Sequence, residues 1–245
     1  MKINRILVLL ALILCLGCNH SKNRPGKSSD VKNEKDSISI ITKPYKNSRN
    51  VTEYEIPVLK GTNIQHGIQK RYYLHGSIYS EIPYVQGKRE GIAKTYYPAA
   101  KDAKPAVWKE QPYENNELNG ICRRYHRNGA LQAEYEYKNG LPAVGLKEYT
   151  ISGKPVKLPG LILSKNDAGV YYYVTARLSN NEKNVDYYIG DLVDGKYLPE
   201  NLKGLQVKNG VGEILLPLNT KKVTITAEMY TEYRNKYLVS KTILF

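Results

Sequence analysis

Apolar residues follow three different patterns along the chain, and each pattern predicts a different kind of segment. An uninterrupted apolar run of eleven residues covers Ile6 to Leu16. Short units that begin with Gly and Ile repeat between residues 67 and 155, and longer alternating segments follow from about Val156. Eleven residues at 1.5 Å rise span about 16 Å, well short of a hydrocarbon core of about 30 Å, so the first run does not predict a transmembrane helix.

The middle of the chain repeats one unit. The units start at Gly67, Gly91 and Gly120, and each has Ile at the second position and Tyr five positions after the Gly. A decayed fourth start lies at Gly145, and the spacings are 24, 29 and 25 residues. An insertion from Pro98 to Pro105 accounts for the longest spacing. Half a unit is expected before the first, because Glu55-Ile56-Pro57 matches Glu81-Ile82-Pro83.

Each unit is predicted to be a β-hairpin. In the third unit, Asn128-Gly129 separates two strand-like segments and predicts a two-residue type I′ turn, which needs φ > 0 at both positions. His75-Gly76 occupies the same place in the first unit. The second halves end in a further set of turn residues: Gln86-Gly87, Asn115-Asn116 and Asn139-Gly140. The fold class is therefore all-β, a meander of stacked hairpins.

The last ninety residues predict a second β domain. Apolar positions alternate with polar ones in Val170–Leu178 and in Val223–Tyr230, which is typical of half-buried strands. Turns are expected at Asp194-Gly195, at Asn209-Gly210 and at Arg234-Asn235-Lys236. Six or seven strands in this length favour a small immunoglobulin-like β-sandwich, with a barrel as the alternative.

The repeats resemble a known family. Tyr72-Tyr73-Leu74-His75-Gly76 and Tyr84-Val85-Gln86-Gly87, the latter continuing to Gly91, fit the alternating Tyr-Tyr-x-x-Gly and Tyr-x-x-Gly-x-x-x-Gly motifs of the MORN-repeat-variant family. Proteins of this family are often described as YwqK-like antitoxins. The resemblance covers roughly 100 of the 245 residues. It implies MORN-variant β-hairpin repeats that serve as scaffolds or partner-binding surfaces, and it brings no catalytic residues.

The N-terminus has the order of a secretory signal. Lys2 and Arg5 precede the apolar run, and Gly17 stands directly before Cys18. The stretch Leu14–Cys18 resembles the lipobox of bacterial lipoproteins, with Cys15 where the consensus prefers Leu. The resemblance implies a diacylglyceryl thioether on Cys18, cleavage before it, and a third acyl chain, such as palmitate, on the new amine. The alternative is an ordinary cleaved signal in which Cys18 is incidental.

Residues 18–50 are predicted to be a disordered tether. They are rich in Asn, Ser, Lys and Pro, and have little apolar content before Ile38. The tether carries eight Lys and Arg against three Asp and Glu, compared with 15 against 11 in residues 51–155 and 12 against 9 in 156–245. The net charge of +14 is therefore most concentrated next to the anchor, where anionic headgroups are the expected partner. Export makes a nucleic-acid partner improbable.

One face of the repeats is a candidate binding surface. Lys70, Lys94 and Arg123 share one position of the repeat and are expected to form a column about 9 to 10 Å apart, suited to an anionic polymer. The alternative is that cross-strand carboxylates neutralise the column, with Glu81, Glu110 and Glu134 opposite the three cations. The repeat tyrosines complete the candidate surface: Tyr72, Tyr96 and Tyr125.

No catalytic or metal-binding pattern stands out in the sequence. Cys122 and His126 are four residues apart, which on a strand separates them by about 13 Å, too far to share a metal or a proton. His126 falls where the other units carry Tyr73 and Tyr97, which favours an aromatic position. The chain has four His and lacks both a Gly-x-Ser-x-Gly motif and a P-loop. We therefore expect a non-enzymatic protein with no cofactor and no metal.

The sequence thus predicts four segments: a signal peptide in residues 1–17, the lipidated cysteine and tether in 18–50, repeats in 51–155 and a sandwich in 156–245. The expected function is a lipid-anchored cell-envelope lipoprotein that presents its repeat surface to a protein or glycan. One alternative is a toxin-neutralising protein of antitoxin or immunity type. Another is a binder of anionic envelope polymer or lipid. The expected location is the periplasm-facing side of the outer membrane.

Overall fold

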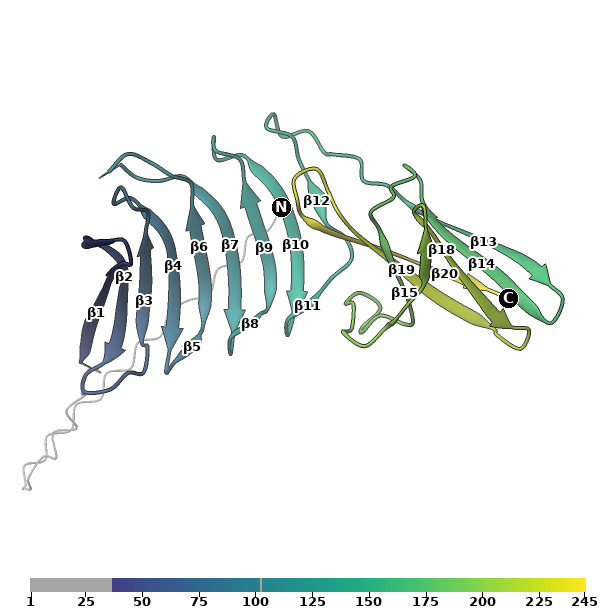
Figure 1. Cartoon of the computed structure of the whole chain (residues 1–245), viewed down its shortest axis with the longest axis horizontal. Helices are drawn as coiled ribbons and strands as arrows, with labels where there is room; N and C mark the ends of the chain where they lie inside the picture. The colour runs from purple at the N-terminus through teal and green to yellow at the C-terminus, as the bar shows by residue number, and fades with distance from the viewer. Residues whose placement is uncertain (1–36, 102) are drawn as a thin grey trace, which may run out of the picture. The chain divides into compact units, whose positions relative to one another are not determined.

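The computed structural model describes residues 37–101 and 103–245, and this part of the chain is all-β (Figure 1). One antiparallel sheet has twelve strands, and two further antiparallel sheets have four strands each. The predicted signal peptide and Cys18 lie outside the described residues. Within the described part, no helix has the length and apolar character needed to cross a membrane.

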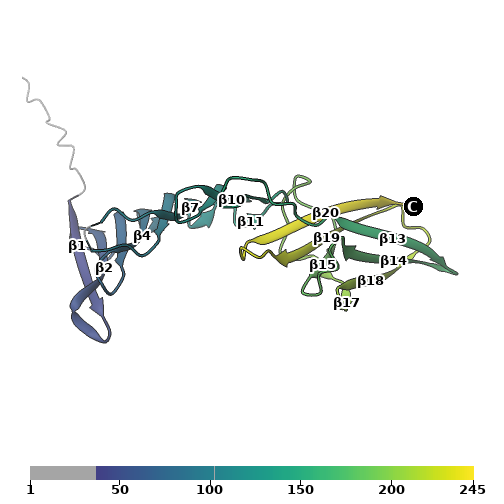
Figure 2. The ribbon, with the colours of Figure 1, turned by 90° about the horizontal axis from the view of Figure 1, so that it is seen from above.

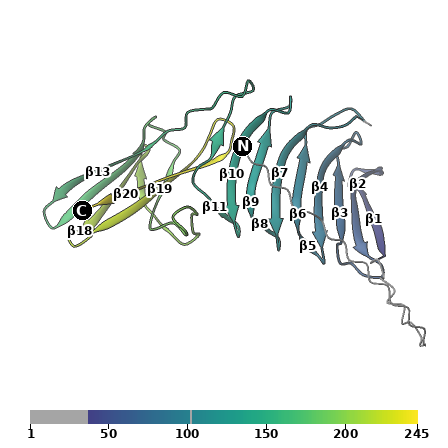
Figure 3. The same cartoon turned by 180° about the vertical axis from the view of Figure 1, so that it is seen from behind.

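The long strands of this sheet lie side by side in chain order, and the short strands β5, β8 and β12 pair with β4, β7 and β10 (Figure 3). Seen from above, it is a single layer of strands (Figure 2). Its strands are β1 (Ile38–Tyr45), β2 (Ser48–Leu59), β3 (Gly67–Tyr72), β4 (Ile78–Val85), β5 (Lys88–Arg89), β6 (Gly91–Tyr96), β7 (Val107–Glu114), β8 (Glu117–Leu118), β9 (Gly120–Tyr125), β10 (Leu131–Lys138), β11 (Leu141–Pro142) and β12 (Lys147–Glu148). The predicted meander of hairpins is confirmed.

The three predicted repeat starts are the first residues of β3, β6 and β9. Each start must be Gly, as the third shows: Gly120 has φ +113°, and an added Cβ would lie 3.2 Å from the Cγ of Pro112. A residue with a side chain would be strained by this backbone conformation and would also press on the proline. The glycine therefore lets the proline of one hairpin pack against the first residue of the next.

The turns divide into two kinds, and the two-residue turn predicted at Asn128-Gly129 is wrong, as is its counterpart at His75-Gly76. Asn115 and Asn116 have φ of 50° and 75°, as a type I′ turn requires. Between β9 and β10, Gly129 has φ +86°, whereas Asn128 is not among the residues with positive φ. This loop is longer than two residues, because His126 N–H donates to the carbonyl of Ala130 at 2.8 Å. The Asn128 side chain instead accepts a bond from Ala130 N–H at 3.1 Å, which stabilises the longer loop.

The predicted C-terminal boundary of the tether, residue 50, is wrong, because strands begin at Ile38. Residues 38–45 and 48–59 form β1 and β2, which pair from Ile38↔Leu59 to Tyr45↔Ser48. The Tyr45 hydroxyl donates to the carbonyl of Tyr72 at 2.6 Å, as the Tyr73 hydroxyl donates to that of Tyr96 at 2.9 Å. The expected half unit is therefore a complete hairpin. Pairing with a neighbouring strand overrides the polar composition that predicted disorder in residues 38–50.

The C-terminal domain consists of two sheets. One has the order β13-β14-β18-β17 and the other β16-β15-β19-β20. Their bounds are β13 (Leu161–Ala168), β14 (Tyr171–Leu178), β15 (Asp186–Ile189), β16 (Lys203–Gly204), β17 (Gln206–Lys208), β18 (Val211–Pro217), β19 (Lys222–Tyr230) and β20 (Lys236–Leu244). These are eight strands where six or seven were predicted.

Both sheets contribute to one apolar core, which includes Val174 and Leu178 of β14 and Ile225 of β19. Most of the predicted inward positions are buried: Val174, Ala176 and Leu178 in β14, and Val223, Ile225, Ala227 and Met229 in β19. Tyr172 is half-buried, and Val170, just before β14, is 72% exposed, so the predicted alternation begins too early. In β19 the alternate residues Thr224 and Thr226 are buried as well, so this strand is covered on both sides.

Polar contacts join the last repeat to the two-sheet domain. The Arg124 guanidinium donates to the carbonyl of Tyr233 at 3.1 Å and to Asn235 Oδ1 at 2.6 Å. The buried Glu148 carboxylate accepts bonds from Thr231 and Asn235, each at 2.6 Å. Ala133 of β10 and Leu146 also belong to the apolar core of the two-sheet domain. The domain boundary is therefore a packed and hydrogen-bonded junction.

Candidate binding surface

The predicted column of cations lies on one face of the repeat sheet, but carboxylates alternate with it. Cross-strand register places eight residues in one row: Glu55, Lys70, Glu81, Lys94, Glu110, Arg123, Glu134 and Lys147. We call this row the charge ladder. Two of its ion pairs are Lys94–Glu110 at 3.3 Å and Arg123–Glu134 at 3.2 Å. The predicted cross-strand pairs are confirmed, and the ladder has no net charge.

The repeat tyrosines lie beside the charge ladder and bind its carboxylates. The Tyr72 hydroxyl donates to Glu55 at 2.8 Å, Tyr96 to Glu81 at 2.6 Å and Tyr125 to Glu110 at 2.8 Å. Burial, followed by the bond to Glu110, raises the pKa of Tyr125. Each tyrosine therefore ties its own hairpin to the preceding one, and its hydroxyl is already engaged within the chain.

A third row on the same face is apolar. Register pairs Ile40 with Pro57, Ile68 with Pro83, and Ile92 with Pro112, and Ile121 continues the row. We call these seven residues the isoleucine row. From β2 to β9 it lies two residues from the charge ladder along each strand, and side chains two apart on a strand share a face. The exposed fractions of Ile68, Ile92 and Ile121 are 53%, 55% and 43%.

We refer to this side of the sheet, with the tyrosines, the charge ladder and the isoleucine row, as the ladder face. The structure brings together all six predicted surface residues: Lys70, Lys94, Arg123, Tyr72, Tyr96 and Tyr125. The sequence reasoning missed the isoleucines, although Ile follows Gly in every full unit. That pairing of Gly and Ile was the available signal, but it does not reveal whether the Ile is covered.

His126 takes an aromatic position, as predicted. The Tyr97 hydroxyl donates to the carbonyl of Tyr125 at 2.8 Å, and His126 Nε2 lies 2.9 Å from the carbonyl of Tyr149, one unit further on. The imidazole thus replaces a tyrosine hydroxyl in a repeated hydrogen bond. This bond gives His126 a structural role.

Cys122 is fully buried in β9. Burial raises the pKa of its thiol to about 12, and the positive charge of Lys109 opposes this only in part. The thiol is therefore protonated at neutral pH, whereas a nucleophilic cysteine needs a thiolate. Within the described residues, no three His, Cys, Asp or Glu side chains gather to hold a metal ion.

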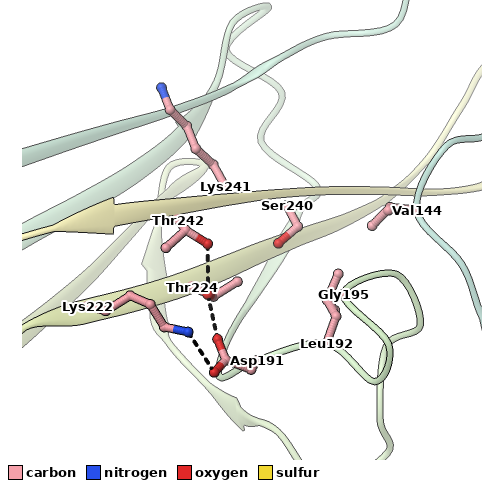
Figure 4. Close-up of a pocket in the computed structure, with 9 residues that line it drawn as sticks. All are labelled: Val144, Asp191, Leu192, Gly195, Lys222, Thr224, Ser240, Lys241 and Thr242. Atoms are coloured by element: carbon pink, nitrogen blue, oxygen red, sulfur yellow. Dashed lines mark hydrogen bonds and ion pairs between the residues drawn. The ribbon is translucent and has the colours of Figure 1, made fainter.

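A shallow hollow lies on the two-sheet domain (Figure 4). The Asp191 carboxylate accepts bonds from the Thr224 hydroxyl at 2.7 Å and from the Lys222 ammonium at 3.0 Å, and these two bonds lower its pKa. Thr224 also lies 2.9 Å from the Thr242 hydroxyl. Figure 4 shows these groups directed at one another, while Lys241 points away from them. The hollow is thus a self-satisfied polar network, and it ranks below the ladder face as a candidate site.

Comparison with known proteins agrees with the repeat assignment. Residues 65–86 and 118–139 match the MORN repeat variant family. The first match covers β3 and β4, and the second covers β9 and β10. No curated protein and no solved structure matches the chain. The class that these findings define is an all-β protein whose long meander sheet carries MORN repeat variants.

Proposed function

We propose that this chain is a non-enzymatic cell-envelope lipoprotein that presents its ladder face to a protein partner. The observation that carries the proposal is the isoleucine row, in which half-exposed apolar side chains recur on every second strand. A row of exposed apolar groups flanked by polar ones is typical of a protein interaction surface. The neighbouring charge ladder adds alternating charges that specify how a partner aligns.

The ladder face suits a protein better than an anionic polymer or a glycan. An anionic polymer needs an unbroken basic column, whereas a carboxylate lies between each pair of cations. A glycan needs polar groups that are available for hydrogen bonds. On this face the hydroxyls of Tyr72, Tyr96 and Tyr125 already donate to carboxylates. The half-exposed isoleucines of this face favour a protein, because a protein partner can bury apolar surface.

We propose, further, that Cys18 carries the lipid anchor and that the protein faces the periplasm from the outer membrane. The Leu14–Cys18 motif supports this. Cells fed labelled palmitate should yield a labelled chain, and Cys18→Ser should abolish the label. A labelled Cys18→Ser variant would overturn the anchor without affecting the binding proposal.

For the C-terminal domain we propose an immunoglobulin-like sandwich. The immunoglobulin order places strands A-B-E-D in one sheet and C-F-G, extended by C′, in the other. Taking β13 as A and β20 as G, the orders β13-β14-β18-β17 and β16-β15-β19-β20 follow this arrangement. The strand order therefore supports the immunoglobulin type over a barrel.

Crosslinking in intact cell envelopes tests the binding proposal. The full chain should be crosslinked to a protein partner, and Ile92→Asp should remove this product because it places a charge in the isoleucine row. Leu215→Asp is the matched control, since Leu215 is 56% exposed and Ile92 is 55% exposed, both on strands. Equal crosslinking of both variants would overturn the proposal.

A further inference from the structure

We infer that the partner of the ladder face is a second copy of this chain, bound face to face about a two-fold axis that runs parallel to the strands between β4 and β6. The inference rests on the proposed function, since it names the protein that the ladder face binds. Three properties of the face support it: charge, shape and area.

The charges of the face are self-complementary. A two-fold axis parallel to the strands reverses their order, so β4 faces β6 of the second copy, β3 faces β7 and β2 faces β9. Glu81 then lies opposite Lys94 of the second copy, Lys70 opposite Glu110, and Glu55 opposite Arg123. The three cations on these six strands each meet a carboxylate of the other copy, because the ladder alternates in sign from strand to strand.

The isoleucine row is self-complementary about the same axis. Reversal places Ile92 opposite Pro83 of the second copy, Ile68 opposite Pro112, and Ile121 opposite Pro57. These three protruding isoleucines each meet a flat proline ring instead of another isoleucine. Alternation of large and small side chains lets two faces interdigitate at the spacing of about 10 Å that packed sheets adopt.

The area is sufficient for a reversible dimer. Six strands about 4.8 Å apart and six residues long cover about 29 Å by 20 Å, or about 1,150 Å² over the two copies. Specific interfaces begin at about 1,000 Å² in total, so the surface fits a weak and salt-sensitive dimer. Moving the axis toward β10 would bring the second copy against Lys196 and Tyr197, whose side chains contact Glu136 on this face. With the axis between β4 and β6, only the edge strand β1 of the second copy lies opposite β10, outside the six strands counted above.

Sedimentation of the purified full chain over a range of concentrations tests the inference. The chain should form dimers whose dissociation constant rises with salt. Ile92→Lys should raise that constant at least tenfold, whereas Leu215→Lys, at matched exposure, should leave it unchanged. A chain that stays monomeric at every concentration, or a dimer that both variants weaken equally, would overturn the inference.

A charge exchange between two variants separates the interface from effects on the fold. Lys94→Glu and Glu81→Lys should each weaken the dimer, because like charges then face each other across the axis. An equimolar mixture should form a mixed dimer, since each altered side chain meets an opposite charge on the other variant. Failure of the mixture to associate, with both variants folded by circular dichroism, would also overturn the inference.

The outcome for the proposed function is read separately. If the chain is monomeric and is crosslinked to a different protein in a way that depends on Ile92, the dimer inference is wrong but the proposed function is supported. If the chain is monomeric and its crosslinks do not depend on Ile92, both the dimer inference and the proposed function are wrong.

Discussion

The repeat sheet and the two-sheet domain are both antiparallel β structures, yet they are stabilised differently. In the two-sheet domain, large side chains such as Val174, Leu178 and Ile225 are fully buried between two layers. In the repeat sheet, the most buried side chains of the central strands are small, as in Ala93, Cys122 and Ala133. A single layer has little interior, so its apolar groups stay partly exposed.

Repeated polar contacts take the place of a core in the repeat sheet. Each hairpin is joined to the previous one by a tyrosine hydroxyl on a carboxylate, and to the next by Tyr73, Tyr97 or His126 on a backbone carbonyl. Burial of apolar side chains therefore stabilises the two-sheet domain, whereas hydrogen bonds that recur in each hairpin stabilise the repeat sheet. Five substitutions test this difference, in order of decreasing expected effect.

Ile225→Ala should have the largest effect. Ile225 is fully buried in the core, so the truncation loses burial and leaves a cavity, at a cost of about 3 kcal/mol in the free energy of unfolding. Urea unfolding followed by circular dichroism measures this cost. Ile92→Ala, on the half-exposed isoleucine row, should cost less than about 1 kcal/mol. If the two substitutions lower the free energy of unfolding equally, the two regions do not differ in how far burial stabilises them.

Glu148→Ala should weaken the junction between the two regions. The substitution leaves the Thr231 hydroxyl and the Asn235 amide without their buried acceptor, at a cost of about 2 kcal/mol. Unfolding should also separate into two transitions, one for each region. Glu148→Gln keeps an acceptor oxygen and should cost less. A single transition in the alanine variant would show that Glu148 does not couple the regions.

The sequence predicted the parts of the fold that depend on short-range pattern. The glycine starts, the alternation in β14 and β19, and the pairing of Lys70 with Glu81 all follow from side chains that share a face or oppose each other across a hairpin. It failed at residues 38–50, because pairing of β1 with β2 overrides their polar composition. At Asn128 a side-chain bond to the loop overrides the turn preference of Asn-Gly.

The two surface sites differ in how far they could be foreseen. The ladder face repeats with the sequence period, so its six predicted residues come together. The Asp191 network depends on Lys222 and Thr224, more than thirty positions away along the chain, and on the pairing of β19 with β15 and β20 within one sheet. No local pattern encodes that arrangement. Exposure of the isoleucine row was also hidden, because periodicity predicts a face but not what covers it.

Tyr96→Phe tests the polar contacts of the repeat sheet. It removes a 2.6 Å hydrogen bond to the Glu81 carboxylate while keeping the ring, and should cost about 1.5 kcal/mol. Tyr230→Phe in the two-sheet domain is the control, because Tyr230 is 64% exposed, and should change stability by less than about 0.5 kcal/mol. If Tyr96→Phe changes stability as little as Tyr230→Phe, the tyrosine–carboxylate hydrogen bonds do not stabilise the repeat sheet.

Cys122 gives the repeat sheet a pH dependence. Its thiol keeps its proton in the folded state up to a pKa of about 12, whereas the thiol of the unfolded chain ionises near its ordinary pKa of 9.0. This contribution to stability is complete below pH 9 and is lost as the pH rises from 9 to 12, and the loss is about 1.4 kcal/mol at pH 10. Comparing unfolding free energies at pH 8 and pH 10 should show a smaller decrease for Cys122→Ala than for the unaltered chain. An identical decrease would mean that the folded thiol ionises normally.

Lys94→Ala should have the smallest effect on folding. Lys94 forms its ion pair with Glu110 at 3.3 Å on the exposed ladder face, where water and salt screen the charges. The free energy of unfolding should fall by about 0.5 kcal/mol or less, and the difference should vanish at high salt. A cost comparable with that of Tyr96→Phe would mean that the charge ladder itself holds the hairpins together. A small cost leaves the alternating charges available to align a partner, because the sheet does not depend on them for its own stability.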